Sequence, residues 1–480
     1  MKLHAETLIK KNIGNIHFIG IGGIGMSGIA EILHNLGYSV QGSDTSDNYN
    51  MERLKKLGIK VFYSHSSENI KDAAVVVKSS AIKSTNSEII AARERKIPVV
   101  KRSEMLAELM RFKFSIAIAG THGKTTTTSL AAIMFEAAGL NPTVINGGII
   151  NSRGTNAYLG SGDYLIAEAD ESDATFIKIP STIGIITNID PEHLDFYGNF
   201  DALKAAFHSF IENLPFYGFG VLCIDHPEVK NLSKKISDRK IITYGIDSDD
   251  ADIKAINIKQ EINGSTYDVV ISERIANGRE RLIKNLYLPT PGLHNVLNSL
   301  SIIAVAIELK FEYSVITTGF KEFKGVKRRF TQVAEINGIR IIDDYAHHPT
   351  EISATLKTAK TVLKNSKNKI IAIAQPHRYS RVHDLFSEFA HCFSDADNII
   401  IADIYPAGEE PIEGINKNIL AATIKKANPK KEVRPLDNLE NLPYIINSIA
   451  KEGDIVIFLG AGNITDWAYA LPGQMKDLNL

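Results

Sequence analysis

Cysteine is scarce in this sequence: 480 residues include only Cys223 and Cys392. The two lie far apart and lack the close spacing of a metal or redox pair, so we expect buried thiols in a reducing compartment. No run approaches the ~18 apolar residues that a membrane-spanning helix needs. The start, MKLHAETLIKKN, also lacks the apolar core of a signal peptide. We therefore expect a cytoplasmic protein that does not insert into a membrane.

An excess of charge of one sign is also missing. The chain has 54 Lys and Arg against 55 Asp and Glu, which gives a net charge of −1. A dedicated nucleic-acid binder would carry a clear positive excess, so we expect no nucleic-acid partner. The sequence has no low-complexity segment or short repeat, and its 44% hydrophobic and 23% charged residues are typical of a globular enzyme. We expect a monomer or a weak homodimer.

The chain is too long for a single core and shows three successive α/β patterns. Short apolar runs alternate with helical stretches from residue 16, again from residue 114, and again from about residue 339. This alternation predicts an α/β fold of three domains, each built on a mainly parallel sheet. The predicted domains are residues 1–107 (Rossmann-like), 108–325 (P-loop) and 326–480 (Rossmann-like). Within the second, the alternating residues 251–290 with an Asn-Gly turn predict an antiparallel hairpin.

The first pattern opens with a glycine loop between a strand and a helix. It fits G-x-G-x-x-G, and an acidic residue follows at the end of the next expected strand. Such a loop lets the backbone approach a diphosphate at a helix N-terminus. A tight turn without a ligand remains an alternative, and the motif does not separate NAD from a UDP-sugar. The candidate residues are Gly20, Gly22, Gly23, Gly25 and Asp44.

The second pattern opens with a shortened phosphate-binding loop, GTHGKTTTT. The commonest loop of this type has a glycine where Ile118 stands. Backbone N–H groups of the loop can hold phosphates, Lys124 can reach the β- and γ-phosphates, and Thr125 can bind Mg²⁺. A glycine-rich turn beside a surface lysine is the alternative. The candidate ATP-binding residues are Gly120, Thr121, His122, Gly123, Lys124, Thr125 and Thr126.

Two acidic clusters follow at the ends of later strands. Mg²⁺ prefers hard oxygen ligands, and two clusters after one phosphate loop favour a metal site over solvated loops. His193 is an unusual ligand for Mg²⁺, and its spacing alone leaves its role open. The clusters contain Glu168, Asp170, Glu171 and Asp173, and then Asp190, Glu192, His193 and Asp195.

These motifs resemble the Mur ligases, the ATP-dependent amide-forming enzymes of peptidoglycan assembly. The resemblance rests on GTHGKTTTT, EADESD, NIDPEHLDFYG and PGLHNVLNSLSI. The motifs GIGGIGMSGIAEIL, FKGVKRRF, DDYAHHPTEI and QPHRYSR are similar to the member that adds L-alanine to UDP-N-acetylmuramate. The resemblance implies one domain for the UDP-sugar, one for ATP, and one that closes over both with the amino acid. It also implies an acyl-phosphate intermediate and Mg²⁺, with two ions expected.

Site residues follow from the same resemblance. It implies that Lys124 and Arg329 contact the ATP phosphates and that Thr125, Glu168 and His193 bind metal. It places His294, Asn295 and Asn298 near adenine, and Asp344 near the ribose. It places Tyr345, His377, Arg378 and Arg381 around the amino acid. His347 or His348 is expected to accept the amine proton, with His348 the candidate we carry forward.

One position departs from the sister enzymes. Those that add later residues carry a lysine, modified to a metal-bridging carbamate, fourteen positions after the His of HLD; here that position is Phe207. A carbamate cannot form on phenylalanine, and Lys204 would face another side of the helix. Three alternative functions remain at this point: a recycling ligase that joins a murein tripeptide to the same UDP-sugar, a nicotinamide oxidoreductase, and a regulatory P-loop NTPase.

Overall fold

The structure, a computed structural model, describes residues 14–79, 81–111, 113–151, 153–172, 174–276, 278–279, 281–363 and 367–478. The side chains of Thr175 and Asp195 are not described. The predictions for the amino-terminal stretch, for Asp173 and for the Asp195 side chain therefore fall outside the described residues.

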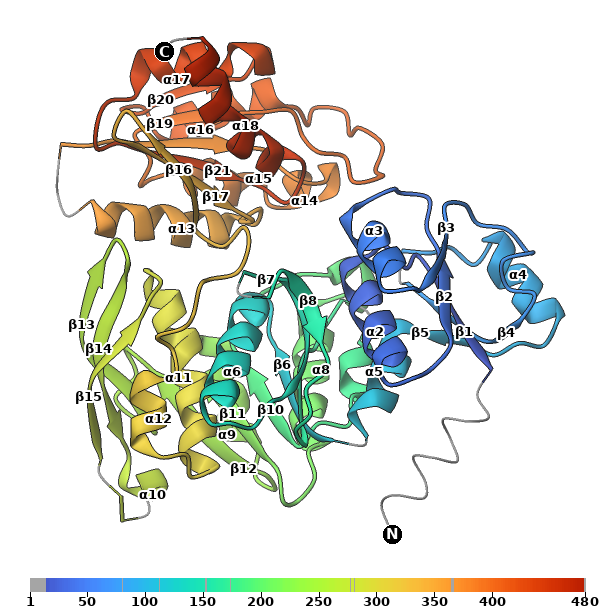
Figure 1. The fold of residues 1–480 in the computed structure, drawn as a ribbon. Coiled ribbons are helices and arrows are strands. Elements are labelled where there is room, and N and C mark those ends of the chain that lie inside the picture. The colour runs from blue at the N-terminus through green and yellow to red at the C-terminus, as the bar shows by residue number, and fades with distance from the viewer. Residues whose placement is uncertain are drawn as a thin grey trace. The chain divides into compact units, whose positions relative to one another are not determined.

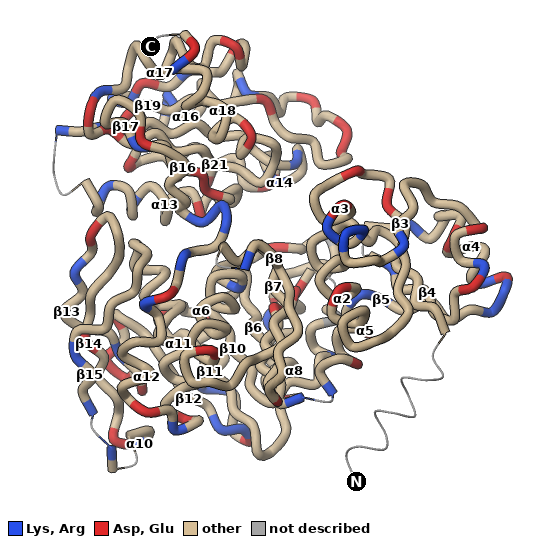
Figure 2. The backbone as a smooth tube through the Cα atoms, in the orientation of Figure 1, with Lys and Arg blue, Asp and Glu red and all other residues tan. Residues whose placement is uncertain are grey.

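The chain divides into two compact units (Figure 1). The first unit comprises Met1–Asn257, Tyr267–Tyr287 and Val296–Lys324. The second comprises Ile258–Thr266, Leu288–Asn295 and Gly325–Leu480. The domain limits near residues 107 and 325 stay predictions. Acidic and basic residues are interspersed along the backbone of both units (Figure 2).

The first sheet is five-stranded and parallel, in the order β3-β2-β1-β4-β5. Its strands are β1 (Asn15–Ile19), β2 (Val40–Ser43), β3 (Lys60–Phe62), β4 (Ala73–Lys78) and β5 (Val99–Lys101). Its helices are α2 (Ile24–Asn35), α3 (Tyr49–Lys56), α4 (Ser87–Glu94) and α5 (Arg102–Met110). Parallel strands bring the glycine loop after β1 and the residues after β2, β3 and β4 to one edge of the sheet.

The second sheet has ten strands in the order β15-β14-β13-β12-β11-β10-β6-β9-β7-β8. In chain order its strands begin with β6 (Phe114–Ala119), β7 (Thr143–Ile150), β8 (Thr155–Tyr158), β9 (Tyr164–Glu168), β10 (Ile183–Ile186), β11 (Phe219–Cys223) and β12 (Lys240–Gly245). Strands β13 (Ile253–Glu261) and β14 (Gly264–Ile271) form the predicted hairpin across Ile262 and Asn263, and β15 (Leu282–Leu288) adds the edge.

The helices of this part begin with α6 (Lys124–Ala137), which follows the phosphate loop. The others are η1 (Thr175–Lys178), α7 (Leu194–Tyr197), α8 (Phe200–Glu212), α9 (Pro227–Lys235), α10 (Glu273–Ala276), α11 (Leu293–Glu308) and α12 (Tyr313–Thr318). The strands β6, β10 and β11 are continuous apolar runs because helices cover both faces of this parallel region.

Helix α2 packs closely on β8, which joins the first two sheets within the first unit. A Cβ atom at Gly28 would lie 2.7 Å from the Cβ of Ala157. The amide of Asn156 donates to the carbonyl of Ile24 at 2.6 Å, and Arg53 donates to the hydroxyl of Thr155 at 2.8 Å. These contacts fix the helix that follows the glycine loop against the sheet that carries the phosphate loop.

The third sheet lies in the second unit and has the order β16-β17-β21-β18-β19-β20, with only β16 antiparallel. Its strands are β16 (Thr331–Ile336), β17 (Ile339–Asp344), β18 (Ile370–Ala374), β19 (Asn398–Ile401), β20 (Glu432–Pro435) and β21 (Ile455–Leu459). Its helices are α13 (Pro349–Val362), α14 (Tyr379–Asp384), α15 (Phe386–His391), α16 (Lys417–Ala427), η2 (Leu439–Asn441), α17 (Leu442–Ile449) and α18 (Ile464–Asp477).

The predicted α/β class with three mainly parallel sheets is confirmed. Both cysteines are buried free thiols, as predicted, and burial raises the pKa of Cys223 to about 12. Among the described helices, none is both long enough and apolar enough to cross a membrane.

Candidate functional site

The phosphate loop, residues 120–123, turns sharply between β6 and α6. Gly120 has φ +133° and Gly123 has φ +84°, values that strongly favour glycine. A Cβ atom at Gly120 would overlap the hydroxyl of Thr187, and one at Gly123 would lie 2.7 Å from the side-chain oxygen of Asn298. Asn298, predicted near adenine, therefore lies against the phosphate loop.

Thr187 and Asn188, directly after β10, brace this loop through side chains that the sequence analysis did not select. The Asn188 carboxamide oxygen accepts from the His122 N–H at 2.7 Å, and the Thr187 hydroxyl donates to the His122 carbonyl at 2.6 Å. The Asp190 N–H donates to the Thr121 hydroxyl at 2.8 Å. His122 Nε2 also lies 3.5 Å from the Asp190 carboxylate. Residues 187–190 thus hold the phosphate loop in its conformation.

Lys124, the first residue of α6, has three oxygen partners. Its ammonium donates to the carbonyls of Gly120 at 2.5 Å and Thr121 at 3.0 Å, and to the Glu171 carboxylate at 2.9 Å. Burial alone would lower the pKa of Lys124, but Glu171, Glu168 and Asp170 outweigh it and raise the pKa. Lys124 is therefore a permanently charged group at the mouth of the loop.

Glu168, the last residue of β9, is fixed beside Thr125. Its Oε2 accepts from the Thr125 hydroxyl at 3.0 Å and from the Gly147 N–H at 2.9 Å. A Cβ atom at Gly147 would lie 2.5 Å from that carboxylate, so glycine permits the approach. Thr125 and Glu168 form the hard-oxygen pair that a divalent cation prefers. Thr126 is buried under the loop.

A second group of ligand atoms lies nearby in the first unit. Atoms of Glu171, Glu192 and His193 lie within 4.8 Å of one another. Glu171 is only 2% exposed, and its Oε2 has no hydrogen-bond partner. Burial raises the pKa of Glu171 to about 7, although Lys124 opposes the shift. His193 has φ +56°, a left-handed conformation that is uncommon for residues other than glycine. A cation would satisfy this buried oxygen, so the donor set fits a metal.

The glycine loop of the first sheet has the geometry expected of a diphosphate site. Gly20 has φ +80° and turns the chain out of β1. The Gly22 N–H donates to Asp44 Oδ2 at 2.9 Å, and the Ser46 N–H donates to Asp44 Oδ1 at 2.9 Å. Asp44 thus clamps the loop, and each of its oxygens keeps a lone pair for a ribose hydroxyl.

A cavity of about 300 Å³ in the first unit extends from the glycine loop to Glu168 at the end of β9. Glycine-loop residues from Gly23 to Met26 form one wall. The lining also includes Asn146, Gly147, Glu168 and Asp170. A ligand bound at the glycine loop can therefore extend to the Glu168 carboxylate.

In the second unit, the predicted residues Arg329, Asp344 and Tyr345 lie together. Asp344 accepts backbone N–H groups from Phe330 at 2.7 Å and Ala346 at 2.8 Å, and burial raises its pKa to about 6. The Arg329 guanidinium lies 5.4 Å from the Tyr345 ring centre and 3.8 Å from Glu351. Asp344 therefore fixes the loop that presents Arg329.

The tautomers of the two neighbouring histidines follow from their partners. His347 Nδ1 lies 2.9 Å from the Tyr345 carbonyl, which can only accept, so Nδ1 carries the proton and Nε2 the lone pair. His348 Nδ1 accepts the Thr350 N–H at 3.3 Å and caps α13, so its proton is on Nε2. Of the two, His347 has the tautomer of a proton acceptor.

Residues His377, Arg378 and Arg381 follow β18 at the carboxyl edge of the third sheet. His377 stacks on Tyr405 with ring centres 5.4 Å apart. Burial, and then His347 and the two arginines, lower the pKa of His377 to about 4, so it is neutral at pH 7. Arg378 has φ +70°, a strained conformation for a non-glycine residue, and its side chain is exposed.

The predicted adenine residues in the second unit lie at the start of α11. His294 is buried, and burial lowers its pKa to about 4. The Asn295 carboxamide donates to the Pro291 carbonyl at 2.7 Å and thus braces the turn before the helix.

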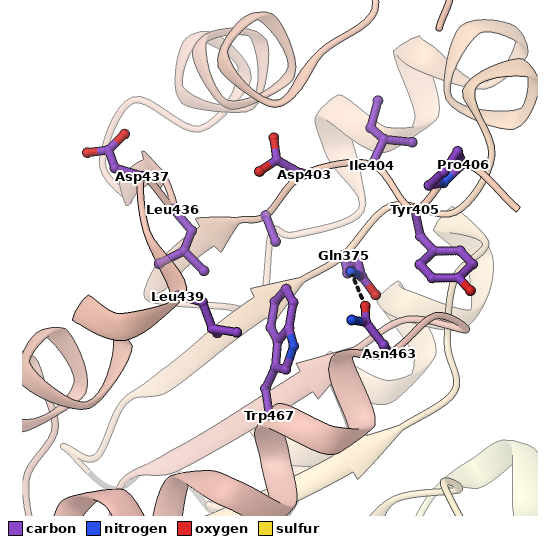
Figure 3. A pocket seen from close by; sticks show the side chains of 11 residues that line it. Gln375, Asp403, Ile404, Tyr405, Pro406, Leu436, Asp437, Leu439, Asn463 and Trp467 are labelled. Atoms are coloured by element: carbon purple, nitrogen blue, oxygen red, sulfur yellow. Dashed lines mark hydrogen bonds between the residues drawn. The ribbon is translucent and has the colours of Figure 1, made fainter. Parts of the chain in front are cut away.

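A separate cavity of about 260 Å³ lies at the carboxyl edge of the third sheet (Figure 3). Its polar base is the Gln375 carboxamide, which donates to Asn463 at 2.8 Å. Trp467 and Tyr405 form its aromatic walls. Because Tyr405 also stacks on His377, this cavity borders the predicted amino-acid residues.

Comparison with known proteins gives the family. Residues 15–114 match "Mur ligase family, catalytic domain", residues 118–306 match "Mur ligase middle domain", and residues 328–462 match "Mur ligase, glutamate ligase domain". The chain belongs to the Mur ligase family. The resemblance that the motifs indicated is thereby confirmed.

Individual relatives of this Mur ligase match over nearly the whole chain. The UDP-N-acetylmuramate–L-alanine ligase of Rickettsia bellii is 59% identical over 469 residues, 98% of each chain. The protein of the same name from Brucella ovis is 56% identical over 97% of this chain and 98% of its own. The solved structure of UDP-N-acetylmuramate–alanine ligase from Thermotoga maritima has a TM-score of 0.80 at 30% identity, covering 97% of this chain and 100% of its own.

The position of the carbamate lysine is apolar in this Mur ligase. Phe207 is fully buried in α8 and packs 5.2 Å from the ring centre of Phe176. Lys204 pairs with Asp201 at 2.8 Å and with Glu228 at 3.6 Å. Glu171 and Glu192, rather than a modified lysine, are the carboxylates gathered at His193.

The sequence analysis missed several residues that line the cavity or contact the phosphate loop: Arg102, Asn146, Gly147, Thr187 and Asn188. Each lies in β7 or immediately after a strand, where open α/β sheets place ligands. That position was the available signal, and it was applied only to acidic residues.

Proposed function

We propose that the protein joins L-alanine to UDP-N-acetylmuramate with cleavage of ATP to ADP and phosphate, in the cytoplasmic synthesis of peptidoglycan precursors. As a Mur ligase, the chain is an ATP-dependent enzyme that forms an amide bond. The observation that carries the proposal is the cavity that both the glycine loop and Glu168 line. A sugar nucleotide held by the loop can present its acid to the phosphate site there.

The chemistry explains why one enzyme needs both loops. A carboxylate is a poor acyl donor because its leaving group would be oxide. When the lactyl carboxylate attacks the γ-phosphorus in line, ADP leaves and the carboxylate oxygen becomes the bridging oxygen of an acyl phosphate, a mixed anhydride. The neutral amine of alanine then attacks the acyl carbon, and the tetrahedral intermediate expels phosphate.

The first unit would provide the charge stabilisation for this transfer. Lys124 and the loop N–H groups would hold the phosphates, and Gly120, Thr121, His122 and Gly123 would shape the loop around them. Thr125 and Glu168 would hold one Mg²⁺, which offsets negative charge on the transferring group. Glu171, Glu192 and His193 fit a second cation. We propose Arg329 as a further cation for the phosphates, with His294, Asn295, Asn298 and Asp344 for the nucleoside.

The amine proton requires an acceptor in the second unit. His347 has its lone pair on Nε2, whereas His348 uses its lone pair to cap α13. We therefore propose His347 as the acceptor and His348 as the residue that holds α13 in place. This revises our expectation for His348, because proton uptake at its Nδ1 would break the cap.

The alternatives fit less of the molecule. A nicotinamide oxidoreductase would have no use for Lys124 or for the candidate metal ligands Thr125 and Glu168. A regulatory NTPase leaves the glycine loop and its cavity unused. A recycling ligase would share both nucleotide sites, but the high-identity relatives are named as L-alanine ligases.

Phosphate release separates these functions in one experiment. The protein is incubated with ATP, Mg²⁺ and UDP-N-acetylmuramate, and phosphate is measured with L-alanine, other single amino acids or the murein tripeptide added separately. We expect release that depends on the UDP-sugar and is fastest with L-alanine. Release that requires the tripeptide, or that occurs without the UDP-sugar, would reject the proposal.

Arg381→Lys is expected to raise the KM for alanine by roughly ten- to a hundredfold. Alanine offers little apolar area, so its carboxylate must supply much of the recognition. An arginine binds a carboxylate through two parallel hydrogen bonds, which lysine cannot reproduce, and a hydrogen bond to a charged group contributes about 1.5–3 kcal/mol. Steady-state kinetics with each substrate varied in turn measures the effect.

The KM values for ATP and the UDP-sugar serve as internal controls and should move far less. If ATP affinity falls while the KM for alanine is unchanged, these arginines serve the phosphates, and our amino-acid site is misplaced.

A further inference from the structure

Arg102 is a cation in the wall of the shared cavity, and the mechanism above gives it no task. It is the first residue of α5 and directly follows β5. Its Nη2 donates to Asp170 Oδ2 at 2.9 Å, and 23% of the side chain is exposed. Asp170 is itself anchored, because its Oδ1 accepts the Ser172 N–H at 3.0 Å. The carboxylate thus fixes one edge of the guanidinium.

The other edge of the guanidinium faces the glycine loop. A Cβ atom at Gly25 would lie 2.8 Å from Arg102 Nη1 and 3.2 Å from its Cδ. Any residue other than glycine at position 25 would displace the arginine. The last glycine of the motif therefore has a specific use here: it lets a guanidinium contact the first turn of α2.

A diphosphate could bind in this cavity only if a cation offset the acidic side chains that line it. Among the described residues that line it, Glu168 and Asp170 are acidic, and Arg102 is the one lysine or arginine. A diphosphate carries about two negative charges, and two bare carboxylates would repel it. Arg102 neutralises Asp170 and retains free N–H groups for another anion.

The backbone at the start of α2 also favours an anion. Helix α2 begins after Gly23 with no side-chain cap and no acidic residue in its first turn. The first N–H groups of a helix have no intrahelical acceptor and favour an anion. Arg102 Nη1 lies beside that first turn, so the backbone donors and the guanidinium converge on one position.

We propose that Arg102 binds the diphosphate of the sugar nucleotide at the glycine loop, with Asp170 as the residue that positions it. The proposal rests on the proposed function, since it takes the first sheet as the sugar-nucleotide site. The Arg102–Asp170 pair also links the glycine loop to the phosphate site, because Asp170 lies two residues after Glu168. The lactyl carboxylate is the rival anion, but the free edge of the guanidinium faces the loop rather than Glu168.

Calorimetry without ATP tests the assignment with two probes, UDP and UDP-N-acetylmuramate. Only the second carries the lactyl carboxylate. Arg102→Ala should weaken both by about ten- to a hundredfold, as expected for lost hydrogen bonds to a charged group. Asp170→Asn should weaken both by a smaller factor, because the arginine remains but is no longer held. Arg111→Ala is the matched control: it removes an exposed arginine just after the same helix and should change neither affinity.

The outcomes separate the possible roles. Weakened binding of UDP-N-acetylmuramate alone would assign Arg102 to the carboxylate and overturn the proposal. Unchanged affinity for both probes in a folded variant would leave only a structural ion pair and would also overturn it. If wild-type protein binds neither probe, the proposed function fails instead. If Arg102→Ala does not fold, the larger, polar and uncharged replacement Arg102→Gln decides by the same criteria.

Discussion

Replacing Lys124 with alanine is expected to lower kcat for ligation by about a thousandfold or more, while the UDP-sugar still binds. The ammonium lies at the mouth of the phosphate loop, where negative charge on the transferring phosphoryl group must be offset. Losing one such preorganised cation typically costs about 10³-fold or more in phosphoryl transfer. Calorimetry with UDP-N-acetylmuramate on the variant should give an affinity close to that of wild type, because the glycine loop is built from a different sheet.

A control for Lys124→Ala is needed because Glu171, the buried partner of Lys124, is left unpaired. Glu171 would lose its ion pair, and an uncompensated buried charge can cost about 3–5 kcal/mol of stability. Lys124→Ala combined with Glu171→Gln removes both charges and should restore the Tm without restoring kcat. Loss of sugar binding in a variant with wild-type Tm would refute the division into two nucleotide sites.

Glu168→Gln is the second change with a large expected effect. Glutamine keeps the shape and can still accept the Gly147 N–H, but it removes the charge that holds the cation beside Thr125. We expect kcat to fall by about 10²- to 10³-fold, since a bound metal contributes several kcal/mol of charge stabilisation. The Mg²⁺ concentration for half-maximal rate should rise at least about tenfold, and Mn²⁺ binding followed by electron paramagnetic resonance should weaken in parallel.

A surface carboxylate provides the comparison for Glu168. Glu308, at the last residue of α11, pairs with Lys240 on the exterior, and Glu308→Gln should leave the metal dependence unchanged. A Glu168→Gln protein with normal Mg²⁺ and Mn²⁺ dependence would show that this carboxylate holds the loop rather than the metal.

The parts of the site that the sequence predicted are those encoded by contiguous residues. The glycine loop and the phosphate loop each lie between one strand and one helix, and their glycines at positions 20, 120 and 123 have the positive φ values that such turns require. Both loops could therefore be predicted from their glycine spacing, and the strands before them could be predicted from their continuous apolar runs.

The parts that the sequence did not predict depend on contacts between distant segments. Arg102 meets Asp170 only because α5 and β9 come together in the fold, and Asn188 meets His122 only because β10 lies beside β6. Likewise, the tautomers of His347 and His348 depend on the carbonyl of Tyr345 and the N–H of Thr350, which no side-chain pattern encodes. Residue type and spacing could identify these histidines but not divide their roles.

The transfer of an oxygen atom from the sugar acid to phosphate tests the central claim most directly. UDP-N-acetylmuramate labelled with ¹⁸O in its lactyl carboxylate is converted with ATP, Mg²⁺ and L-alanine, and the released phosphate is analysed by mass spectrometry. The account predicts one carboxylate oxygen in each phosphate formed, because that oxygen leaves the acyl carbon as part of the phosphate. Phosphate without label, formed together with the alanine amide, would contradict it.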